Sequence, residues 1–289
     1  MSEDRQESLD LLIGLLDLEQ LEVDIFRGLS PQVSMQRVFG GQVAGQALVA
    51  AGRTVPADRA VHSLHAYFLR PGDPKIPIIY TVDRIRDGRS FTSRRVIAIQ
   101  HGKAIFSLSA SFHIAEEGLE HQTGMPTAPD PESLPTLDER LAPFADTLEE
   151  RARLPQPIDL RYVQDPAWAQ RASGPRPGPT LVWLRAAGKL PDDPLLHLCA
   201  LTFASDLTLL ESVAVRHGMA FSVDLQAASL DHAMWFHAPF RADGWLLYES
   251  ESPAASGGRG LATGRIWTRE GRQVASVVQE GLLRPLRRS

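Results

Sequence analysis

Two segments of this chain resemble each other, and this internal repeat constrains the fold more than any other feature of the sequence. Residues 62–71 read HSLHAYFLRP, and residues 229–240 read SLDHAMWFHAPF. Both segments mix histidines with aromatic residues, carry a proline at or next to their end, and precede strand-like residues around a glycine turn. The copies align at an offset of 168 to 169, which matches Gly102 with Gly271. Such a repeat predicts two copies of one structural unit.

Each copy shows the same order of elements, a helix followed by strands. Residues 39–55, FGGQVAGQALVAAGRTV, are apolar and rich in small side chains, which predicts a buried helix that a sheet or a ligand approaches closely. In the second copy, Asp193 and Pro194 form a helix start before the apolar segment 195–210. A helix followed by antiparallel-type strands predicts an α+β fold in which a sheet wraps around one helix.

The composition divides the chain into four parts. Residues 1–20 carry a leucine stripe at helical spacing, which predicts a helix used for packing or for subunit contact. Residues 21–115 form the first repeat, and residues 179–289 form the second. Between them, residues 116–178 are rich in proline and acidic residues, so we expect a connector that runs over the surface.

Bulk composition excludes several classes of protein. The 43% hydrophobic and 22% charged residues are typical of a globular protein, and the net charge of -5 argues against a nucleic-acid partner. No run of 18 apolar residues occurs, so we expect no membrane insertion. The single Cys199 suits a reducing compartment, and the acidic N-terminal MSEDRQES is unlike a signal peptide. Together these features predict a cytoplasmic location.

Three polar residues lie in apolar surroundings. Asp206 falls inside an apolar helical segment, on the same predicted face as Cys199 and Phe203. Strand alternation places Gln279 on a small apolar face, and Ser229 opens the aromatic strand. Taken singly, each also fits a structural role: a solvent-facing aspartate, a strand-end glutamine and a strand-entry serine.

Comparison of the two repeats distinguishes a catalytic role of these three residues from a structural one. Ala110 or Ser111 stands at the first-copy position of Gln279, and Val61 lies near that of Ser229. The end of the first helix, LVAAGRT, carries no carboxylate. The second copy therefore has an acid, a hydroxyl and a carboxamide that the first lacks, which predicts one active site per chain, in the second repeat.

Five segments give the chain a specific resemblance. RVFGGQVAGQAL, HSLHAYFLRPGDPKIPIIY, RDGRSFTSRRVIAIQHGKAIFSLSASF, LDHAMWFHAPF and ASVVQEG are similar to motifs of the acyl-CoA thioesterase II family, over residues 11–283. The resemblance implies a double hotdog fold, in which two helices are each wrapped by a curved antiparallel sheet. It implies hydrolysis of acyl-CoA to free fatty acid and coenzyme A, with no metal or organic cofactor. It also implies a homo-oligomer, either a dimer or a tetramer.

The same resemblance assigns the catalytic acid to Asp206, the hydroxyl to Ser229 and the glutamine to Gln279. Many relatives have threonine at the serine position, and the hydroxyl is retained here. Asp206 can accept a proton from water while the other two side chains hold the water in place. A first-half histidine suspected in the family corresponds to His62, whose repeat position lies outside this cluster.

Backbone amides at a helix start can stabilise a developing oxyanion. Gly40, Gly41 and Gln42 begin the predicted first helix, so they are candidate substrate-binding residues. The alternative interpretation of the two glycines is close packing alone.

Two other functions remain as alternatives. A hotdog enoyl-CoA hydratase would need a histidine five residues after the acid, and Glu211 stands there instead. A non-catalytic acyl-CoA binding protein would lack one of the three site residues. No G-x-S-x-G, H-E-x-x-H, phosphate-binding loop or zinc-cluster motif occurs, and we interpret His232 and His237 as structural rather than as metal ligands.

Overall fold

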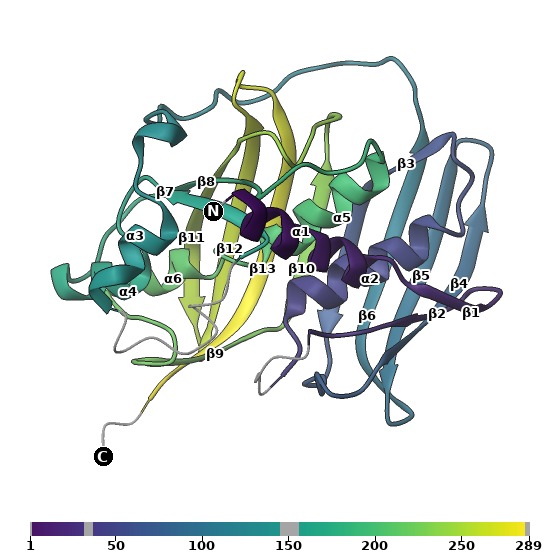
Figure 1. Ribbon diagram of the computed structural model, residues 1–289, viewed down its shortest axis with the longest axis horizontal. Coiled ribbons are helices and arrows are strands. Elements are labelled where there is room, and N and C mark those ends of the chain that lie inside the picture. Colours follow the sequence, from purple (N-terminus) through teal and green to yellow (C-terminus); the bar gives the residue numbers. More distant parts are fainter. Residues whose placement is uncertain (1, 32–36, 145–155, 287–289) are drawn as a thin grey trace.

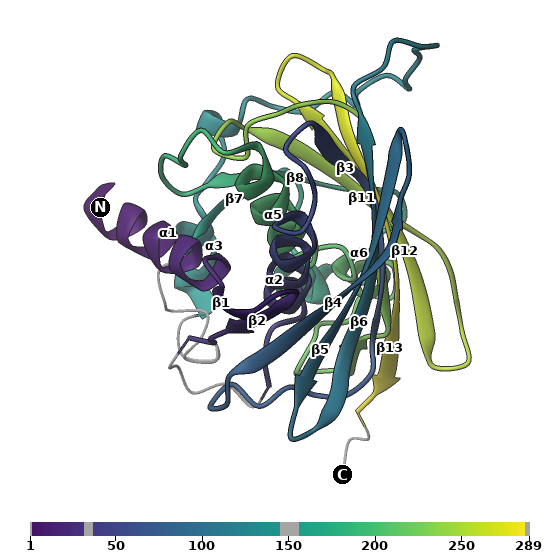
Figure 2. The ribbon, with the colours of Figure 1, turned by 90° about the vertical axis from the view of Figure 1, so that its right-hand side faces the viewer.

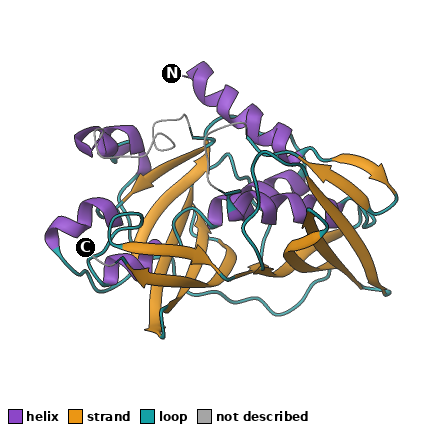
Figure 3. Cartoon of the chain, turned by 90° about the horizontal axis from the view of Figure 1, so that it is seen from below, coloured by secondary structure: helices purple, strands orange, loops and turns teal. Residues whose placement is uncertain are grey.

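One continuous antiparallel sheet, with helices packed on one of its faces, forms the frame of the protein. The computed structural model describes residues 2–31, 37–144 and 156–286. Within these ranges, helices α1, α2 and α5 lie on the same side of the strands (Figures 1 and 2). In the view from below, the strands curve around the central helices (Figure 3).

Each half of the chain contributes one set of elements. The first half contains α1 (Ser2–Leu16), β1 (Glu19–Glu22), β2 (Ile25–Gly28), α2 (Gly40–Gly52), β3 (Arg59–Phe68), β4 (Ile78–Asp87), β5 (Phe91–Gln100) and β6 (Lys103–Ile114). The second half contains β7 (Ile158–Tyr162), β8 (Thr180–Ala186), α5 (Pro194–Ser205), α6 (Glu211–Arg216), β9 (Leu225–Ser229), β10 (Asp231–Phe236), β11 (Leu246–Ser256), β12 (Arg259–Thr268) and β13 (Gln273–Pro285). The short helices α3 (Leu137–Leu141) and α4 (Ala167–Gln170) lie between the halves in sequence.

The strand order confirms the predicted repeat. Neighbours follow the order β1-β2-β4-β5-β6-β3-β10-β13-β12-β11-β8-β7, and β9 pairs separately with β13. The block β4-β5-β6-β3 is thus mirrored by β11-β12-β13-β10. The halves join where β3 pairs antiparallel with β10, with His65 opposite Ala233. The α+β double hotdog prediction is therefore correct.

The two long helices run antiparallel and touch through small residues. A Cβ atom at Gly41 would lie 2.4 Å from the carbonyl oxygen of Phe203, and one at Gly45 would lie 3.2 Å from that of Cys199. Only hydrogen at these positions allows such an approach of two backbones. The first helix is closely approached, as predicted, but its partner is the helix α5 and not a sheet or a ligand.

Helix α1 covers the outer side of this helix pair. Its Leu9, Leu12 and Leu16 are buried, which accounts for most of the leucine stripe within the chain itself. Leu11 lies on the opposite side and is 71% exposed. The stripe therefore serves packing, the first of the two predicted roles. None of the helices in the described ranges is both long and apolar enough to cross a membrane.

Part of the segment between the repeats packs on the outer face of the second half. The indole nitrogen of Trp183 donates to the carbonyl oxygen of Pro129 at 2.9 Å. Met125 and Leu134 pack on the small apolar cluster that contains Trp183 and Leu247. Strand β7 also falls between the predicted repeats in sequence and extends the sheet beyond β8.

The helix contact predicts the effect of a single methyl group. Gly41→Ala places a Cβ against backbone rather than against a flexible side chain, so α2 and α5 must separate. We expect the free energy of unfolding in urea to fall by about 1–3 kcal/mol. Gly14→Ala is the matched control, because a Cβ on Gly14 of α1 would meet nothing within 4 Å. Equal stability of the two variants would contradict the close-packing account.

Candidate active site

Asp206 lies at the end of α5, not inside it. The helix ends at Ser205, and Asp206 follows as the residue that caps it. The prediction of a helix-interior aspartate was wrong, because the helix ends in the middle of the apolar segment. The residues that follow, such as Leu207 and Leu209, pack in the core without continuing the helix. The antiparallel pairing of the helices places Asp206 at the start of α2, where a Cβ on Gly40 would lie 2.7 Å from its Oδ2.

The other two predicted residues reach the same point from the sheet. Ser229 is the last residue of β9, and the strand is interrupted at Leu230 before β10 begins at Asp231. Gln279 lies on β13 between Val278 and Glu280, and its side chain is fully buried. The predicted alternation in this strand, with the glutamine facing inward, is confirmed.

Direct hydrogen bonds join the three side chains. The Gln279 amide nitrogen donates to Asp206 Oδ1 at 2.7 Å and to Ser229 Oγ at 2.7 Å. Ser229 Oγ in turn donates to Asp206 Oδ1 at 3.2 Å. An acid, a hydroxyl and a carboxamide from three segments therefore form a closed triangle at the start of α2.

Opposing effects set the charge of Asp206. Dense protein surroundings raise the pKa of the Asp206 carboxyl, although part of its surface remains exposed. The hydrogen bonds from Gln279 and Ser229 and the backbone N–H of Gly41 act against this rise. The result is a carboxylate with a raised pKa that still has the donors needed to ionise, which suits a general base.

The first three residues of α2 have different roles. The Gly41 N–H is directed to Asp206, so it helps to hold the acid in place. The Gln42 side chain turns away and donates to Leu29 O and Ser30 Oγ, both at 3.0 Å. Only backbone groups of Gly40 and Gln42 are therefore candidates to contact a substrate.

His62 is not brought into the cluster. Its Nε2 lies 2.8 Å from Ser111 Oγ, and its ring makes edge contacts with Phe91 and His113. These neighbours belong to first-half strands, and alternation in β6 puts Ser111 on the face away from α2.

Two residues that the sequence reasoning did not assign extend the hydrogen-bonded group. His232 Nδ1 lies 2.9 Å from Gln279 Oε1, and His232 Nε2 lies 2.9 Å from Ser205 Oγ. His232 was interpreted only as a structural histidine. The repeat contained a usable signal, because the offset of 168 places Leu64 at its first-copy position.

The first half has filled the equivalent space with a different side chain. In the second half, Ala262 pairs with Gln279 across β12 and β13. At the repeat position in the first half, Arg94 pairs with Ala110 across β5 and β6. In the first half the large side chain of the pair is on β5 and the alanine is on β6. In the second half the alanine is on β12 and the large side chain is on β13.

Arg94 is a structural residue in this position. Its guanidinium is 1% exposed and donates to Thr54 Oγ1 and the Thr54 carbonyl, at 2.9 and 3.0 Å, just beyond the end of α2. It also pairs with Asp87 at 2.7 Å. A cation thus caps the C-terminal end of α2, a favourable place for positive charge. This geometry leaves no site like that of Asp206 in the first half.

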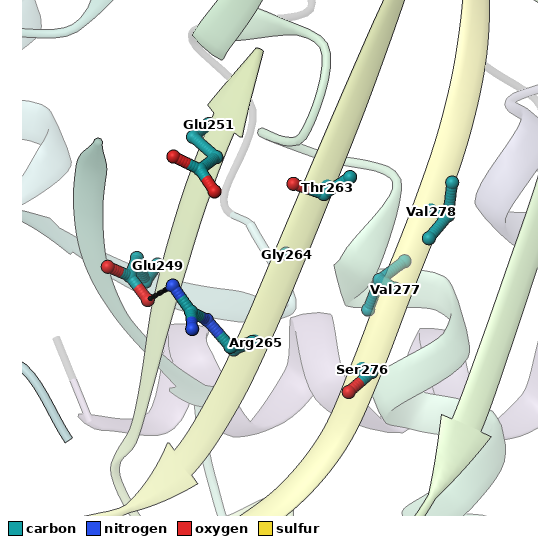
Figure 4. A pocket seen from close by; sticks show the side chains of 8 residues that line it. All are labelled: Glu249, Glu251, Thr263, Gly264, Arg265, Ser276, Val277 and Val278. Atoms are coloured by element: carbon teal, nitrogen blue, oxygen red, sulfur yellow. Dashed lines mark ion pairs between the residues drawn. The ribbon is translucent and has the colours of Figure 1, made fainter. Parts of the chain in front are cut away.

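A hollow on the second half lies on the other face of the sheet (Figure 4). Its volume is about 280 Å³, and its lining residues include Glu249 and Arg265, which form an ion pair at 2.9 Å. Ligand pockets are usually larger, about 300–1,000 Å³, and mostly apolar. Strand alternation separates this hollow from Gln279, so it is not part of the cluster. Within the described ranges, no three histidine, cysteine, aspartate or glutamate side chains gather where they would hold a metal ion.

Comparison with known proteins defines the class. Residues 29–113 match the family model described as "Acyl-CoA thioesterase N-terminal domain", and residues 152–282 match "Acyl-CoA thioesterase". A hot dog fold protein of unknown function from Alicyclobacillus acidocaldarius superimposes with a TM-score of 0.77 at 20% identity, over 95% of this chain and 98% of the other. The fold and the family models together define a double hotdog thioesterase.

Closer relatives define the family. Acyl-coenzyme A thioesterase 8 of Mus musculus is 44% identical, over 95% of this chain and 89% of the relative. The crystal structure of an acyl-CoA thioesterase II from Mycobacterium marinum is 49% identical, with a TM-score of 0.79, over 95% of this chain and 98% of that one. The chain belongs to the acyl-CoA thioesterase II family, and it is a hydrolase of acyl-CoA thioesters.

Replacement of Arg94 tests the view that the first half has only a structural role here. Arg94→Met removes the cap on α2, and we expect the free energy of unfolding to fall by about 2–3 kcal/mol because several hydrogen bonds to a charged group are lost. We expect kcat of the folded variant to stay within about two-fold of wild type, since Arg94 is remote from the reaction. Measurement requires urea unfolding and steady-state hydrolysis of a medium-chain acyl-CoA. A large loss of kcat in a folded protein would show that the first half takes part in the reaction.

Proposed function

We propose that Asp206, Ser229 and Gln279 activate one water molecule for direct attack on the thioester carbonyl of acyl-CoA. The observation that carries this proposal is the closed triangle of hydrogen bonds at 2.7, 2.7 and 3.2 Å, made by residues that lie 23 to 73 positions apart in sequence. No packing requirement calls for three polar side chains at this point, because the equivalent region of the first half manages with an arginine cap.

The steps follow from the chemistry of each group. Asp206 takes a proton from the water as the water oxygen bonds to the carbonyl carbon, while Gln279 and Ser229 hold the water and orient the carboxylate. Negative charge then develops on the carbonyl oxygen, next to the positive end of α2, where the Gly40 and Gln42 amides are the proposed donors. Collapse of this intermediate breaks the carbon–sulfur bond. The thiolate of coenzyme A takes the proton from Asp206, which leaves a free fatty acid and the thiol.

The hydratase alternative finds no support in the geometry. Glu211, five residues after Asp206, is buried away from the triangle and accepts from the Tyr162 hydroxyl at 2.9 Å. His232, the histidine nearest to the acid, is 1% exposed and has both ring nitrogens in contact with protein atoms. No histidine is thus presented to a substrate beside Asp206.

Substitutions in the triangle test the assignment of roles. Asp206→Asn keeps the shape but cannot take a proton, so we expect kcat to fall by roughly 10²–10⁴-fold with little change in KM. Gln279→Ala should also lose substantial rate, because the water is no longer held. Ser229→Thr should stay active, and Ser229→Ala should fall between Gln279→Ala and wild type. The measurement is steady-state acyl-CoA hydrolysis by thiol release.

Circular dichroism of each variant serves as the folding control. A folded Asp206→Asn protein with nearly wild-type kcat would place the catalytic base elsewhere in the chain.

The raised pKa of Asp206 predicts the acid limb of the pH profile. The base works only when ionised, so activity is present above this pKa and is lost as the pH falls through it. Because burial raises the pKa, we expect the acid limb of kcat/KM to lie above the ordinary aspartate value of about 4. Gln279→Ala removes a donor that favours the ionised form, so it should move the limb to still higher pH. An acid limb at or below about pH 4 would contradict the assignment.

The oligomeric state and the location are further proposals. Several exposed apolar side chains lie on α1 and around β1 and β2: Leu11, Leu21, Val23 and Leu29, at 71, 45, 65 and 58% exposure. Exposed apolar side chains of this kind favour association into a homo-oligomer, a dimer or a tetramer. A cytoplasmic location is supported by the features of the sequence alone.

Solution mass tests the association. We expect sedimentation at micromolar concentration to give a multiple of the 31.8 kDa chain. Leu21→Glu and Val23→Glu together should lower the mass, whereas the same change at the exposed Leu119, in the segment between the repeats, should leave it unchanged. A monomer in wild type would contradict the proposal.

A further inference from the structure

His232 connects the proposed catalytic triangle to the end of α5. The ring lies on β10 and is 1% exposed, so water cannot replace its hydrogen-bond partners. Its Nδ1 lies 2.9 Å from Gln279 Oε1, and its Nε2 lies 2.9 Å from Ser205 Oγ. The mechanism proposed above assigns no role to either His232 or Ser205.

The amide of Gln279 can take two orientations, and only one of them serves catalysis. An ionised Asp206 carboxylate only accepts hydrogen bonds, so the amide nitrogen must face Asp206 and Ser229. The amide oxygen then faces His232, where it needs a donor. With the amide reversed, its oxygen would lie against the Asp206 carboxylate, and the two acceptors would repel each other. The orientation of Gln279 therefore depends on a proton at His232 Nδ1.

Ser205 is compatible with that proton in either charge state of the ring. A neutral histidine carries one N–H, so a proton on Nδ1 makes Nε2 an acceptor. The Ser205 hydroxyl can fill this acceptor, or it can donate to the Thr202 carbonyl, which lies at the same distance of 2.9 Å. If His232 is protonated, Nε2 donates to Ser205 and Ser205 donates to Thr202. In both arrangements Nδ1 still donates to Gln279.

The first half lacks every member of this chain of contacts. Leu64 stands at the repeat position of His232, and Gly52 is the last residue of α2, as Ser205 is the last residue of α5. The repeat fold therefore does not need a histidine or a hydroxyl at these points. Their presence coincides with the presence of Gln279 in the second half.

We infer that Ser205 and His232 are positioning residues, which lock the Gln279 amide with its nitrogen toward Asp206 and Ser229. This inference rests on the proposed function, because it gives Gln279 its task in holding the water. Ser205 is the hydrogen-bond partner of His232 Nε2, His232 sets the orientation of Gln279, and Gln279 acts on the reacting groups.

Substitutions at His232 separate positioning from simple packing. His232→Leu copies the side chain at the first-half position and removes the donor, so kcat should fall roughly 10- to 100-fold while KM changes by less than about two-fold. His232→Asn places an amide N–H near the position of Nδ1, and it should recover most of the lost rate. A residue needed only for packing would be replaced better by leucine than by asparagine.

Ser205→Ala has a matched control in the same part of the chain. It should lower kcat by roughly three- to ten-fold, because the buried His232 Nε2 loses its hydrogen-bond partner. Ser212 is also buried, and its Oγ donates to the carbonyl of Leu209 at 2.8 Å, just as Ser205 reaches Thr202. Ser212→Ala should leave kcat within about two-fold of wild type.

The pH profile gives a second readout. The titratable groups around the pair are Asp206 and Asp231 beside His232, and Tyr248, whose hydroxyl donates to the Ser205 carbonyl at 3.2 Å. In His232→Leu the amide donates less well to Asp206, so the acid limb of kcat should move to higher pH. His232→Asn should bring the limb back, since the donor to Gln279 is restored without any charge.

The tautomer of His232 can be observed directly in the wild-type protein. In wild type near neutral pH, burial lowers the pKa of His232, so the ring should be neutral. The ¹⁵N spectrum of labelled imidazole should then show His232 protonated at Nδ1 and bare at Nε2, assigned by the loss of this signal in His232→Asn. A proton on Nε2 alone would overturn the inference.

Two kinetic outcomes would also overturn it: a folded His232→Leu with wild-type kcat, or a folded His232→Asn that is as slow as His232→Leu. Asp206→Asn, measured alongside, separates the two claims. If Asp206→Asn is active, the proposed function fails. If Asp206→Asn is inactive and His232→Leu is not impaired, only the positioning inference fails.

Discussion

The close antiparallel contact between α2 and α5 is the constraint on which the rest of the structure depends. A Cβ on Gly41 would lie 2.4 Å from the Phe203 carbonyl, so the two helices can approach this closely only with glycine there. Antiparallel pairing brings the start of one helix to the end of the other. The acid that caps α5 therefore meets the positive end of α2, and the strands that wrap the pair bring the hydroxyl and the carboxamide to the same point.

The duplicated fold contains two positions where the end of one long helix lies near the start of the other, and different side chains occupy these two positions. At one, a buried Arg94 caps the end of α2 and stabilises the fold. At the other, the arginine position is Ala262, and the space beside it holds Gln279 and His232. A cationic cap suits the negative end of a helix, whereas Asp206 at the end of α5 requires donors around it. In the proposed function, the same geometry thus supports stability in one half and chemistry in the other.

Part of this arrangement follows from local sequence signals, and part depends on contacts between distant segments of the chain. The helix start at Asp193 and Pro194 is a local signal, since a side chain caps its own helix and the proline fits the first turn. The inward face of Gln279 follows from alternation along a single strand. The end of α5 at Ser205 could not be predicted, because no glycine or proline marks it and the following residues are as apolar as the helix.

The role of His232 depends on three elements that meet only in the folded chain, so its spacing in sequence carries no information about Gln279 or Ser205. The sequence signal for a role of His232 was its comparison with Leu64, which stands at the same position of the first copy. For His62, the offset already placed it outside the cluster, and the structure shows why: its partners are first-half residues such as Ser111.

The most direct test of the central claim is a crystal structure with a non-hydrolysable thioether analogue of a medium-chain acyl-CoA. We expect one analogue per chain, with the atom that replaces the carbonyl carbon about 3–4 Å from a water held by Asp206 and Gln279. Its oxygen position should face the start of α2. An analogue whose reacting centre lies in the first half, beside Arg94, or far from the water of Asp206, would contradict the account.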